Sequence, residues 1–252
     1  MEALFDGRTM PDSSHSPAAA PVTAKTLVAS AYHHLRRDII EGRLAPGSKL
    51  RVEHLKDSYG VGAGTLREAL ALLVSDALVV TQGQRGFHVK PISMDDFHDI
   101  TQTRVLLECE ALRQSIEQGD ELWESRIVAA FHLLDRAEAR MAEEPDFPFD
   151  EWEARNKEFH QALISGSQSS WVRHFLGILY QQAERYRRLT VTHNPIPRDL
   201  HAEHQAIFDA ALARDAQTAC SALALHIQTT YRALEQLPHQ VLAPAQAATL
   251  QA

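Results

Sequence analysis

The chain has 252 residues, 44% of them hydrophobic, which is enough apolar material for substantial cores in two domains. It carries 25 Lys and Arg against 33 Asp and Glu, a formal net charge of −8, and only two cysteines. With no secretory leader pattern and no long apolar span in view, we exclude a disulfide-rich secreted protein and a membrane partner. We expect a cytoplasmic protein with reduced thiols.

The charge is divided unevenly along the chain. Residues 21–92 hold ten Lys and Arg against six Asp and Glu, a net charge of +4, whereas residues 93–252 carry −10. Because the local charge of a domain governs its approach to phosphate, this division is expected if only the first part binds nucleic acid. A chance fluctuation among solvated charges is the alternative.

Residues 1–22, rich in Pro, Ser and Ala, predict a disordered tail. Residues 23–91 then predict a winged helix-turn-helix DNA-binding domain. Its expected elements are helices over about 26–41, 52–59 and 64–75 and strands over 78–81 and 87–90. The third helix has the apolar spacing Leu66, Leu70, Leu73 of a recognition helix, and the strands form the wing.

A second domain is predicted over residues 92–237. Pro91 breaks the preceding pattern, and Ser93 with Asp96 resembles a capping box that starts a new helix. Long apolar-periodic stretches follow, and their breaks predict an all-helical bundle of six or seven helices, with a tail over 238–252. The fold class is therefore mainly α: an N-terminal winged helix-turn-helix plus a C-terminal helical bundle.

Side chains of the basic part are candidates for DNA contact. Arg67 lies one turn into the recognition helix, where its guanidinium can pair with guanine; the alternative is a solvated pair with Glu68. Thr65 can offer a hydroxyl to phosphate, and Arg85 at the wing tip can enter a minor groove or remain a plain solvated turn residue. Weaker phosphate candidates are Lys49 and Arg51.

Three segments, residues 40–50, 61–70 and 86–89, resemble the GntR superfamily of bacterial transcription regulators. The helical half resembles the FCD ligand-binding domain of its FadR-like subgroup, so the resemblance covers about residues 25–235. It implies a homodimer whose recognition helices enter successive major grooves of a double-stranded DNA operator. The usual Ser-Arg-Thr-Pro-like tetrad is replaced by Gly62-Ala63-Gly64-Thr65, so base readout is expected to depend more on Arg67 and the wing.

A second constellation lies in the helical half. Asn156 and His160 share one helix face, and His204 and His226 come from later helices. Three imidazoles and one oxygen suit a divalent transition metal such as zinc or nickel, although any of these histidines can instead be a surface or core residue. The resemblance implies the same four ligands, with Asn156 in place of a commoner aspartate, which lowers the expected occupancy. His201 is a competing ligand.

An effector bound over a metal is expected to be a small carboxylate, because the metal and a buried arginine both attract anions. Arg104 resembles the arginine on the first FCD helix; a surface pair with Glu108 is the alternative. A cationic run over residues 185–188 is explained at least as well by a solvated helix face. The tryptophans are expected to serve packing in the core or in a dimer rather than to form an aromatic ligand cage: Trp123, Trp152 and Trp171.

The sequence thus predicts a DNA-binding transcriptional regulator that is controlled by a small organic acid and is not an enzyme. The resemblance implies that it is a repressor, as members of this family usually are. One alternative is a metal-dependent hydrolase, for which Glu158 and Glu203 are the formal bases, although the His-Glu-x-x-His pattern is missing. Another is a regulator that senses the metal itself. A fatty-acyl sensor is disfavoured by the histidines.

Overall fold

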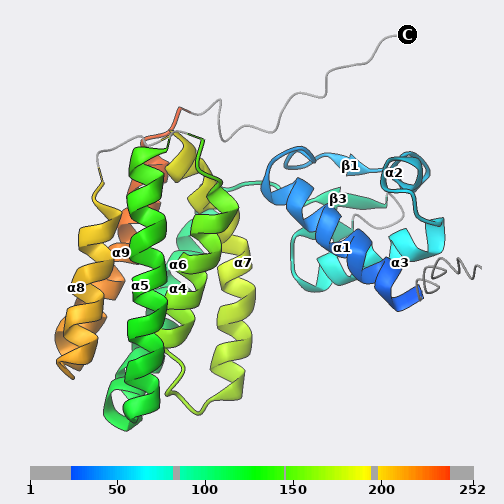
Figure 1. Cartoon of the computed structure of the whole chain (residues 1–252). Helices are drawn as coiled ribbons and strands as arrows, with labels where there is room; N and C mark the ends of the chain where they lie inside the picture. The colour runs from blue at the N-terminus through cyan, green and yellow to red at the C-terminus, as the bar shows by residue number, and fades with distance from the viewer. Residues whose placement is uncertain (1–23, 82–85, 145, 194–197, 239–252) are drawn as a thin grey trace, which may run out of the picture.

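The computed structural model describes residues 24–81, 86–144, 146–193 and 198–238. Two parts lie side by side: a small N-terminal part with three helices and a sheet, and a C-terminal part built from long helices (Figure 1). The mainly α fold class is thereby confirmed. Apart from Pro238, the expected tails over 1–22 and 238–252 lie outside the described residues.

The N-terminal part has the element order of a winged helix-turn-helix. In chain order its elements are α1 (Ala24–Ile40), β1 (Lys49–Leu50), α2 (Val52–Tyr59), α3 (Ala63–Ser75), β2 (Val79–Thr81) and β3 (Phe87–Val89). The strands form one antiparallel sheet in the order β1-β3-β2, with Val79 opposite Val89 and Leu50 opposite Phe87. We did not predict β1, because two residues are too short to show a period of two.

The predicted recognition helix is α3, and its apolar spacing explains its position. Leu66, Ala69, Leu70 and Leu73 recur at helical intervals and are buried against α1 and the sheet. The preceding helix, α2, ends at Gly60, whose φ of 63° is left-handed and whose backbone N–H donates to the carbonyl of Lys56. This turn sets α3 across α2 and leaves the opposite face of α3 free.

Six helices follow, within the range predicted. They are α4 (Met94–Gln118), α5 (Glu121–Glu143), α6 (Phe149–Leu163), α7 (Ser170–His193), α8 (Leu200–Leu212) and α9 (Ala216–Glu235). Side-chain oxygens cap the first turns of five of them, at Ser93, Asp120, Ser169, Asp199 and Asp215. The cap at Ser93 accepts from the N–H of Asp96, as the sequence predicted.

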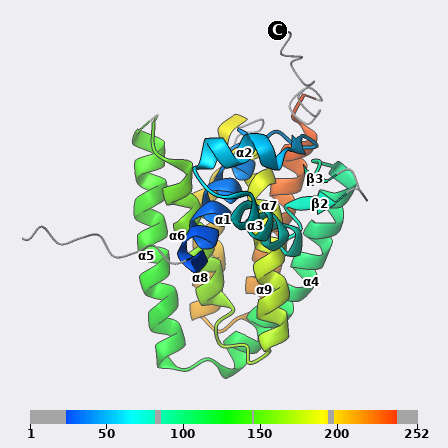
Figure 2. The ribbon, with the colours of Figure 1, turned by 90° about the vertical axis from the view of Figure 1, so that its right-hand side faces the viewer.

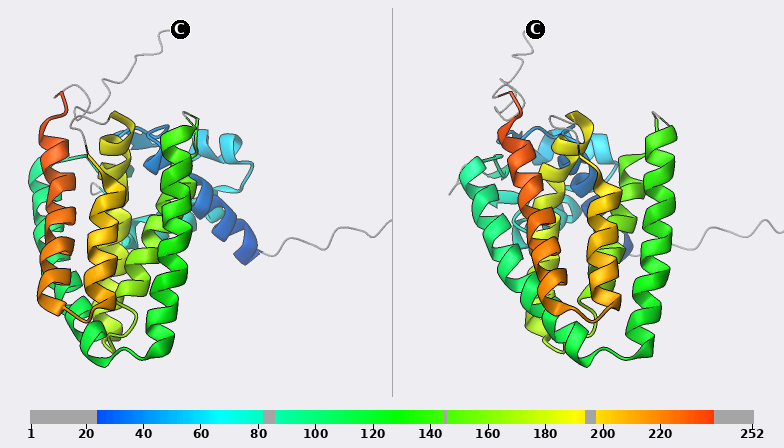
Figure 3. Two further views of the ribbon diagram at one scale, coloured as in Figure 1. Left: turned by 60° about the vertical axis from the view of Figure 1, so that its left-hand side comes forward. Right: turned by 90° about the vertical axis from the view of Figure 1, so that its left-hand side faces the viewer.

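The six helices run roughly along one direction and enclose a shared core (Figure 3). Trp123 and Trp152 are buried in the bundle, and the indole N–H of Trp123 donates to the carbonyl of Leu163 over 3.1 Å. Trp171 does not join this core, because its side chain is 69% exposed and stacks on exposed Phe175; packing in a dimer, the other role expected for it, stays a prediction. None of the described helices combines the length and hydropathy needed to cross a membrane.

The two parts meet along α7, on the side of the bundle shown in Figure 2. Glu184 of α7 forms an ion pair with Arg36 of α1, and the amide of Gln182 donates to the backbone carbonyl of Asp76 at the end of α3. Arg185 donates to the carbonyl of Lys90 over 2.7 Å, in the four-residue connection between β3 and α4. One helix of the bundle therefore holds both the winged part and its connection.

Candidate functional site

The free face of α3 presents a cation to solvent. Arg67 is exposed one turn into the helix, and among the described residues none forms a hydrogen bond or ion pair with it. The surface pair with Glu68, the alternative considered from sequence, is thus not formed. The major groove of DNA admits an α-helix, and a guanidinium without a partner on such a helix is free to donate to base edges or phosphates.

The other DNA candidates lie, along the chain, on α3 itself and on the segments before and after it. Thr65 lies half-buried in the first turn of α3, where the backbone N–H groups still lack helical acceptors and the first turn holds no acidic residue. Lys49 on β1 and Arg51 before α2 are both exposed. Arg85 lies outside the described residues, so its placement at the wing tip stays a prediction.

Three of the four predicted metal ligands come together inside the bundle. One ring nitrogen each of His160 from α6, His204 from α8 and His226 from α9 lies within 4.8 Å of the others, and all three side chains are buried. Their ring centroids are 4.6–5.7 Å apart. Residues separated by up to 66 positions therefore form one compact imidazole cluster, which no single helix could supply.

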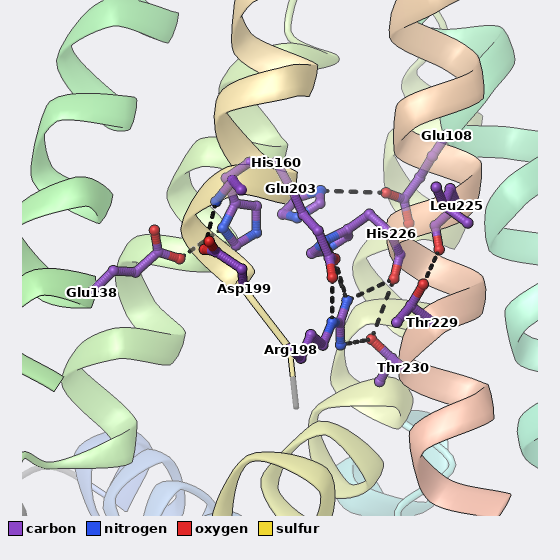
Figure 4. Close-up of polar contacts among 12 residues, drawn as sticks. Glu108, Glu138, His160, Arg198, Asp199, Glu203, Leu225, His226, Thr229 and Thr230 are labelled. Atoms are coloured by element: carbon purple, nitrogen blue, oxygen red, sulfur yellow. Dashed lines mark hydrogen bonds and ion pairs between the residues drawn. The ribbon is translucent and has the colours of Figure 1, made fainter. Parts of the chain in front are cut away.

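Carboxylate side chains contact the Nδ1 atoms of two of these rings. Nδ1 of His204 lies 2.7 Å from a carboxylate oxygen of Glu138 on α5, and Nδ1 of His226 lies 2.8 Å from one of Glu203. A carboxylate accepts only, so each Nδ1 carries the proton and each Nε2 keeps a free lone pair. Figure 4 shows Glu138 and Glu108 on opposite sides of the histidines. Such carboxylate–histidine contacts orient imidazoles toward a metal in known centres.

Two buried polar atoms on the same elements have no partner in the described part of the chain. The Nε2 of His204 and the Oδ1 of Asn156 are buried without a hydrogen-bond partner among the described residues. Asn156 precedes His160 by one helical turn on α6, so both project from the same face. Buried polar atoms without partners cost free energy, and a bound cation would satisfy both of these. The donor set, three imidazoles and an amide oxygen, fits zinc or nickel.

The interior keeps two of these imidazoles, those of His160 and His226, neutral. Burial lowers the pKa of His160 to about 4, although nearby Glu108 opposes the shift. Burial lowers the pKa of His226 well below its ordinary value too, and the neighbouring His204 and Arg198 act in the same direction. A metal binds the neutral imidazole, so these groups are ready to coordinate at neutral pH without first losing a proton.

Arg104 lies in the same interior and is not a surface residue. Its Nε donates to Glu108 over 2.7 Å, and its guanidinium carbon lies 4.5 Å from the ring centroid of Tyr180. Glu108 in turn lies 3.7 Å from Nδ1 of His160. The pair with Glu108 expected as a surface alternative is therefore real but buried, and it links α4 to the histidine cluster.

The cationic run on α7 is also partly buried, so the reading of a solvated helix face is wrong for two of its arginines. Arg187 forms a bidentate pair with Glu153 in the interior, and Arg185 donates to the connection before α4. Both side chains are almost fully buried, and only Arg188 is partly exposed. Guanidinium groups buried in this way need acidic or carbonyl partners from other helices, which the sequence pattern did not reveal.

Sequence reasoning also missed Glu138, although a signal was present. On α5 the buried positions Ile127, Phe131 and Leu134 recur at helical intervals, and Glu138 occupies the next one. A glutamate in an apolar stripe marks a buried carboxylate with a partner. Glu138 also lines a cleft of about 720 Å³, together with Arg198 and exposed His201, so this cleft reaches the carboxylate that contacts His204.

Family models and relatives account for both parts of the chain. Residues 27–89 match the model described as bacterial regulatory proteins, gntR family, and residues 99–229 match that of the FCD domain. The chain belongs to the GntR family. It is a DNA-binding transcriptional regulator of that family with an FCD domain, and the resemblance noted from sequence is confirmed.

Relatives extend over nearly the whole chain. The uncharacterized HTH-type transcriptional regulator BphR of Paraburkholderia xenovorans is 48% identical over 91% of this chain and 92% of its own. The HTH-type transcriptional repressor GlaR of Escherichia coli is 35% identical over 81% of this chain and 94% of its own. A GntR regulator structure from Rhodococcus shares the fold, with a TM-score of 0.66 at 22% identity over 82% of this chain and 97% of that one. These relatives are regulators, not enzymes, so the hydrolase alternative is set aside.

Proposed function

We propose that this GntR regulator is a homodimeric repressor whose affinity for its operator is controlled by a small carboxylate bound at a metal centre in the FCD domain. The observation that carries the proposal is the buried cluster of His160, His204 and His226 with carboxylates behind two of its rings. The names of two relatives contain the word repressor, which supports the direction of control.

The metal ligands in this proposal are His160, His204, His226 and the side-chain oxygen of Asn156. A bound divalent cation supplies a positive anchor for an anionic ligand at a position that the protein keeps dry. Glu138 and Glu203 hold two of the imidazoles in the required tautomer. Arg198 in turn fixes Glu203 through two hydrogen bonds of 2.6 and 2.7 Å, so this arrangement resists rotation.

Arg104 is the proposed partner for the far end of the effector. It uses only Nε in its hydrogen bond to Glu108, so both terminal NH₂ groups remain available to a carboxylate within the described interior. Tyr180 lies over the same guanidinium, and its buried hydroxyl has no partner among the described residues. These available donors favour an oxygen-rich ligand rather than an apolar one.

Helix α7 offers the route from effector to DNA. One of its faces carries Tyr180 and Arg187 into the polar interior, and the adjoining positions Gln182 and Glu184 hold the winged part. A ligand that shifts α7 by even a fraction of a turn therefore changes contacts at Asp76 and Arg36. Such a ligand alters the equilibrium between arrangements of the two winged parts, and the coupling is reciprocal.

The metal centre is tested first, on metal-stripped full-length protein. We expect zinc or nickel to raise the unfolding temperature of the wild type and to bind with a stoichiometry of one per chain, measured by calorimetry and metal analysis. His204→Ala should lose this response, whereas His132→Ala, an exposed histidine on α5, should keep it. If metal raised the unfolding temperature of both variants equally, the proposed metal centre would be refuted.

The regulatory part is tested with DNA selected by the wild type from a random pool. Fluorescence anisotropy of metal-loaded protein is followed while a panel of small mono- and dicarboxylates is added. Loss of operator affinity with one acid only when metal is present supports the proposal. If metal alone changed the affinity for the operator, the metal itself would be the signal. If no acid changed this affinity, the proposal of a carboxylate effector would be refuted.

A further inference from the structure

The chain has two cysteines, and the fold brings them together. Cys109 on α4 and Cys220 on α9 are 111 positions apart in the sequence. The Sγ of Cys109 donates to the backbone carbonyl of Cys220 over 3.4 Å, and the Sγ of Cys220 donates to that of Cys109 over 3.2 Å. Each thiol thus rests on the backbone of the other residue, so the two side chains face each other directly across the helix pair.

Both thiols are free and only partly buried, at the edge of the bundle core. A small reagent can therefore reach them, whereas neighbouring core residues are closed to it. Burial raises the pKa of Cys109 to about 12, to which the neighbouring Cys220 thiol adds, and burial also raises the pKa of Cys220. The reduced pair is thus mostly protonated at neutral pH, so its reaction with an oxidant is slow.

Their position ties the pair to the polar interior. Cys109 directly follows Glu108, which holds Arg104 and faces His160. On the opposite helix, Cys220 lies about one and two-thirds turns before His226. A covalent bond here would fix the spacing of α4 and α9 at the level of these groups.

We propose that Cys109 and Cys220 form a reversible intramolecular disulfide between α4 and α9 when the protein meets a low-molecular-weight disulfide as oxidant. One cysteine thiolate attacks a sulfur of the oxidant, which releases one small thiol and leaves a mixed disulfide on the protein. The second cysteine attacks the protein sulfur of that mixed disulfide, closes the Cys109–Cys220 bond and releases the other small thiol. Two protein S–H groups have lost two protons and two electrons, and these reduce the oxidant to two thiols.

The bond has a consequence for the fold. It closes a loop of about a hundred residues, and such a cross-link restricts the unfolded chain more than the folded one. The oxidised protein should unfold at a temperature roughly 5–10 °C higher than the reduced one. Backbone amides of α9 should exchange hydrogen more slowly, because α9 can no longer separate from α4.

The test uses full-length wild-type protein, folded and reduced, treated with oxidised glutathione. We expect the intact mass to fall by two hydrogens and a non-reduced digest to contain Cys109 and Cys220 in one linked peptide pair. The unfolding temperature should rise by the stated amount and return on addition of a reductant. Cys109→Ser and Cys220→Ser should show no rise, and because the decisive result is on the wild type, a poorly folding variant does not obscure it.

Three outcomes would overturn the proposal: a stable glutathione adduct on either cysteine, disulfide-linked dimers on a non-reducing gel, or no reaction in the folded state while the urea-unfolded chain forms the bond. The inference does not depend on the proposed function. Metal and effector binding can fail in the experiments above while the disulfide forms.

Discussion

The two parts of the molecule carry their polar groups in opposite ways. On the winged part the described cationic candidates, such as Arg67 on α3, are exposed and have no ion-pair partner among the described residues, whereas in the bundle Arg104, Glu108 and His160 are packed inside and joined to one another. An exposed charge costs little free energy in the folded protein, and replacing it leaves the other side chains undisturbed. Buried charges persist only with partners from several helices, so removing one disturbs the rest.

The largest expected effect follows from breaking a buried pair. Glu153→Ala leaves Arg187 without its bidentate partner in the interior and should lower the free energy of unfolding by about 3–5 kcal/mol. Urea unfolding followed by circular dichroism measures this loss. The matched control on the same helix is Glu158→Ala, which breaks an exposed pair with Arg155 and should cost less than about 1 kcal/mol. Similar losses for both variants would contradict the contrast between interior and surface.

The exposed side of the comparison is tested at Arg67. Arg67→Ala should weaken binding to the selected operator by about 1–3 kcal/mol, because it removes a base or phosphate contact, while the unfolding temperature stays unchanged. Anisotropy titrations at two salt concentrations measure the affinity. Arg126→Ala, an exposed arginine on α5, serves as the control and should bind normally. If the Arg67→Ala variant kept both the affinity and the sequence preference of the wild type, residues other than Arg67 would read the bases.

A smaller effect is expected from a carboxylate that only orients a ligand. Glu138→Gln keeps the shape of the side chain but weakens its hold on Nδ1 of His204, so metal affinity should fall about 10- to 100-fold. Competition with a chelator of known affinity gives the number. Asp135→Asn changes an exposed neighbour on the same helix and should leave the affinity within error. If the two variants lost affinity equally, general electrostatics rather than orientation would explain the effect.

The smallest effect concerns an ion pair at the winged surface. Burial tends to raise the pKa of Asp38, but hydrogen bonds from Tyr59 and Arg43 outweigh it and hold the pKa below the ordinary value. A depressed pKa stabilises the fold above the ordinary value of about 3.8, and this stability is lost as the pH falls through the folded pKa. Asp38→Asn should therefore cost about 1 kcal/mol at pH 7 and much less at pH 3 in urea unfolding. A loss of the same size at both pH values would refute this sign.

The sequence was most informative where structure is local. The apolar spacing of α3, the glycine that ends α2 and the cap at Ser93 each depend on neighbours within a few residues, and each was predictable. The histidines could be named, but their proximity depends on packing of α6, α8 and α9. The resemblance to FCD domains supplied that part.

What could not be predicted is the set of partners behind these ligands. The contact of Glu138 with His204 joins positions 66 apart, and that of Arg187 with Glu153 joins positions 34 apart. No period or spacing encodes such pairs. Whether Trp171 packs in the core or lies on the surface could not be predicted for a related reason, because helical spacing does not tell which apolar face another helix covers.

The connection between the two parts limits the DNA that the regulator can use. Only residues 90–93 separate β3 from α4, which is about 13 Å of fully extended chain, and Lys90 is further held to Asp96 and Arg185. In a dimer joined through the bundles, each winged part can therefore move only a short distance relative to its own bundle. Such a dimer should accept one spacer length between its half-sites, and inserting a few base pairs should abolish cooperative binding rather than weaken it gradually.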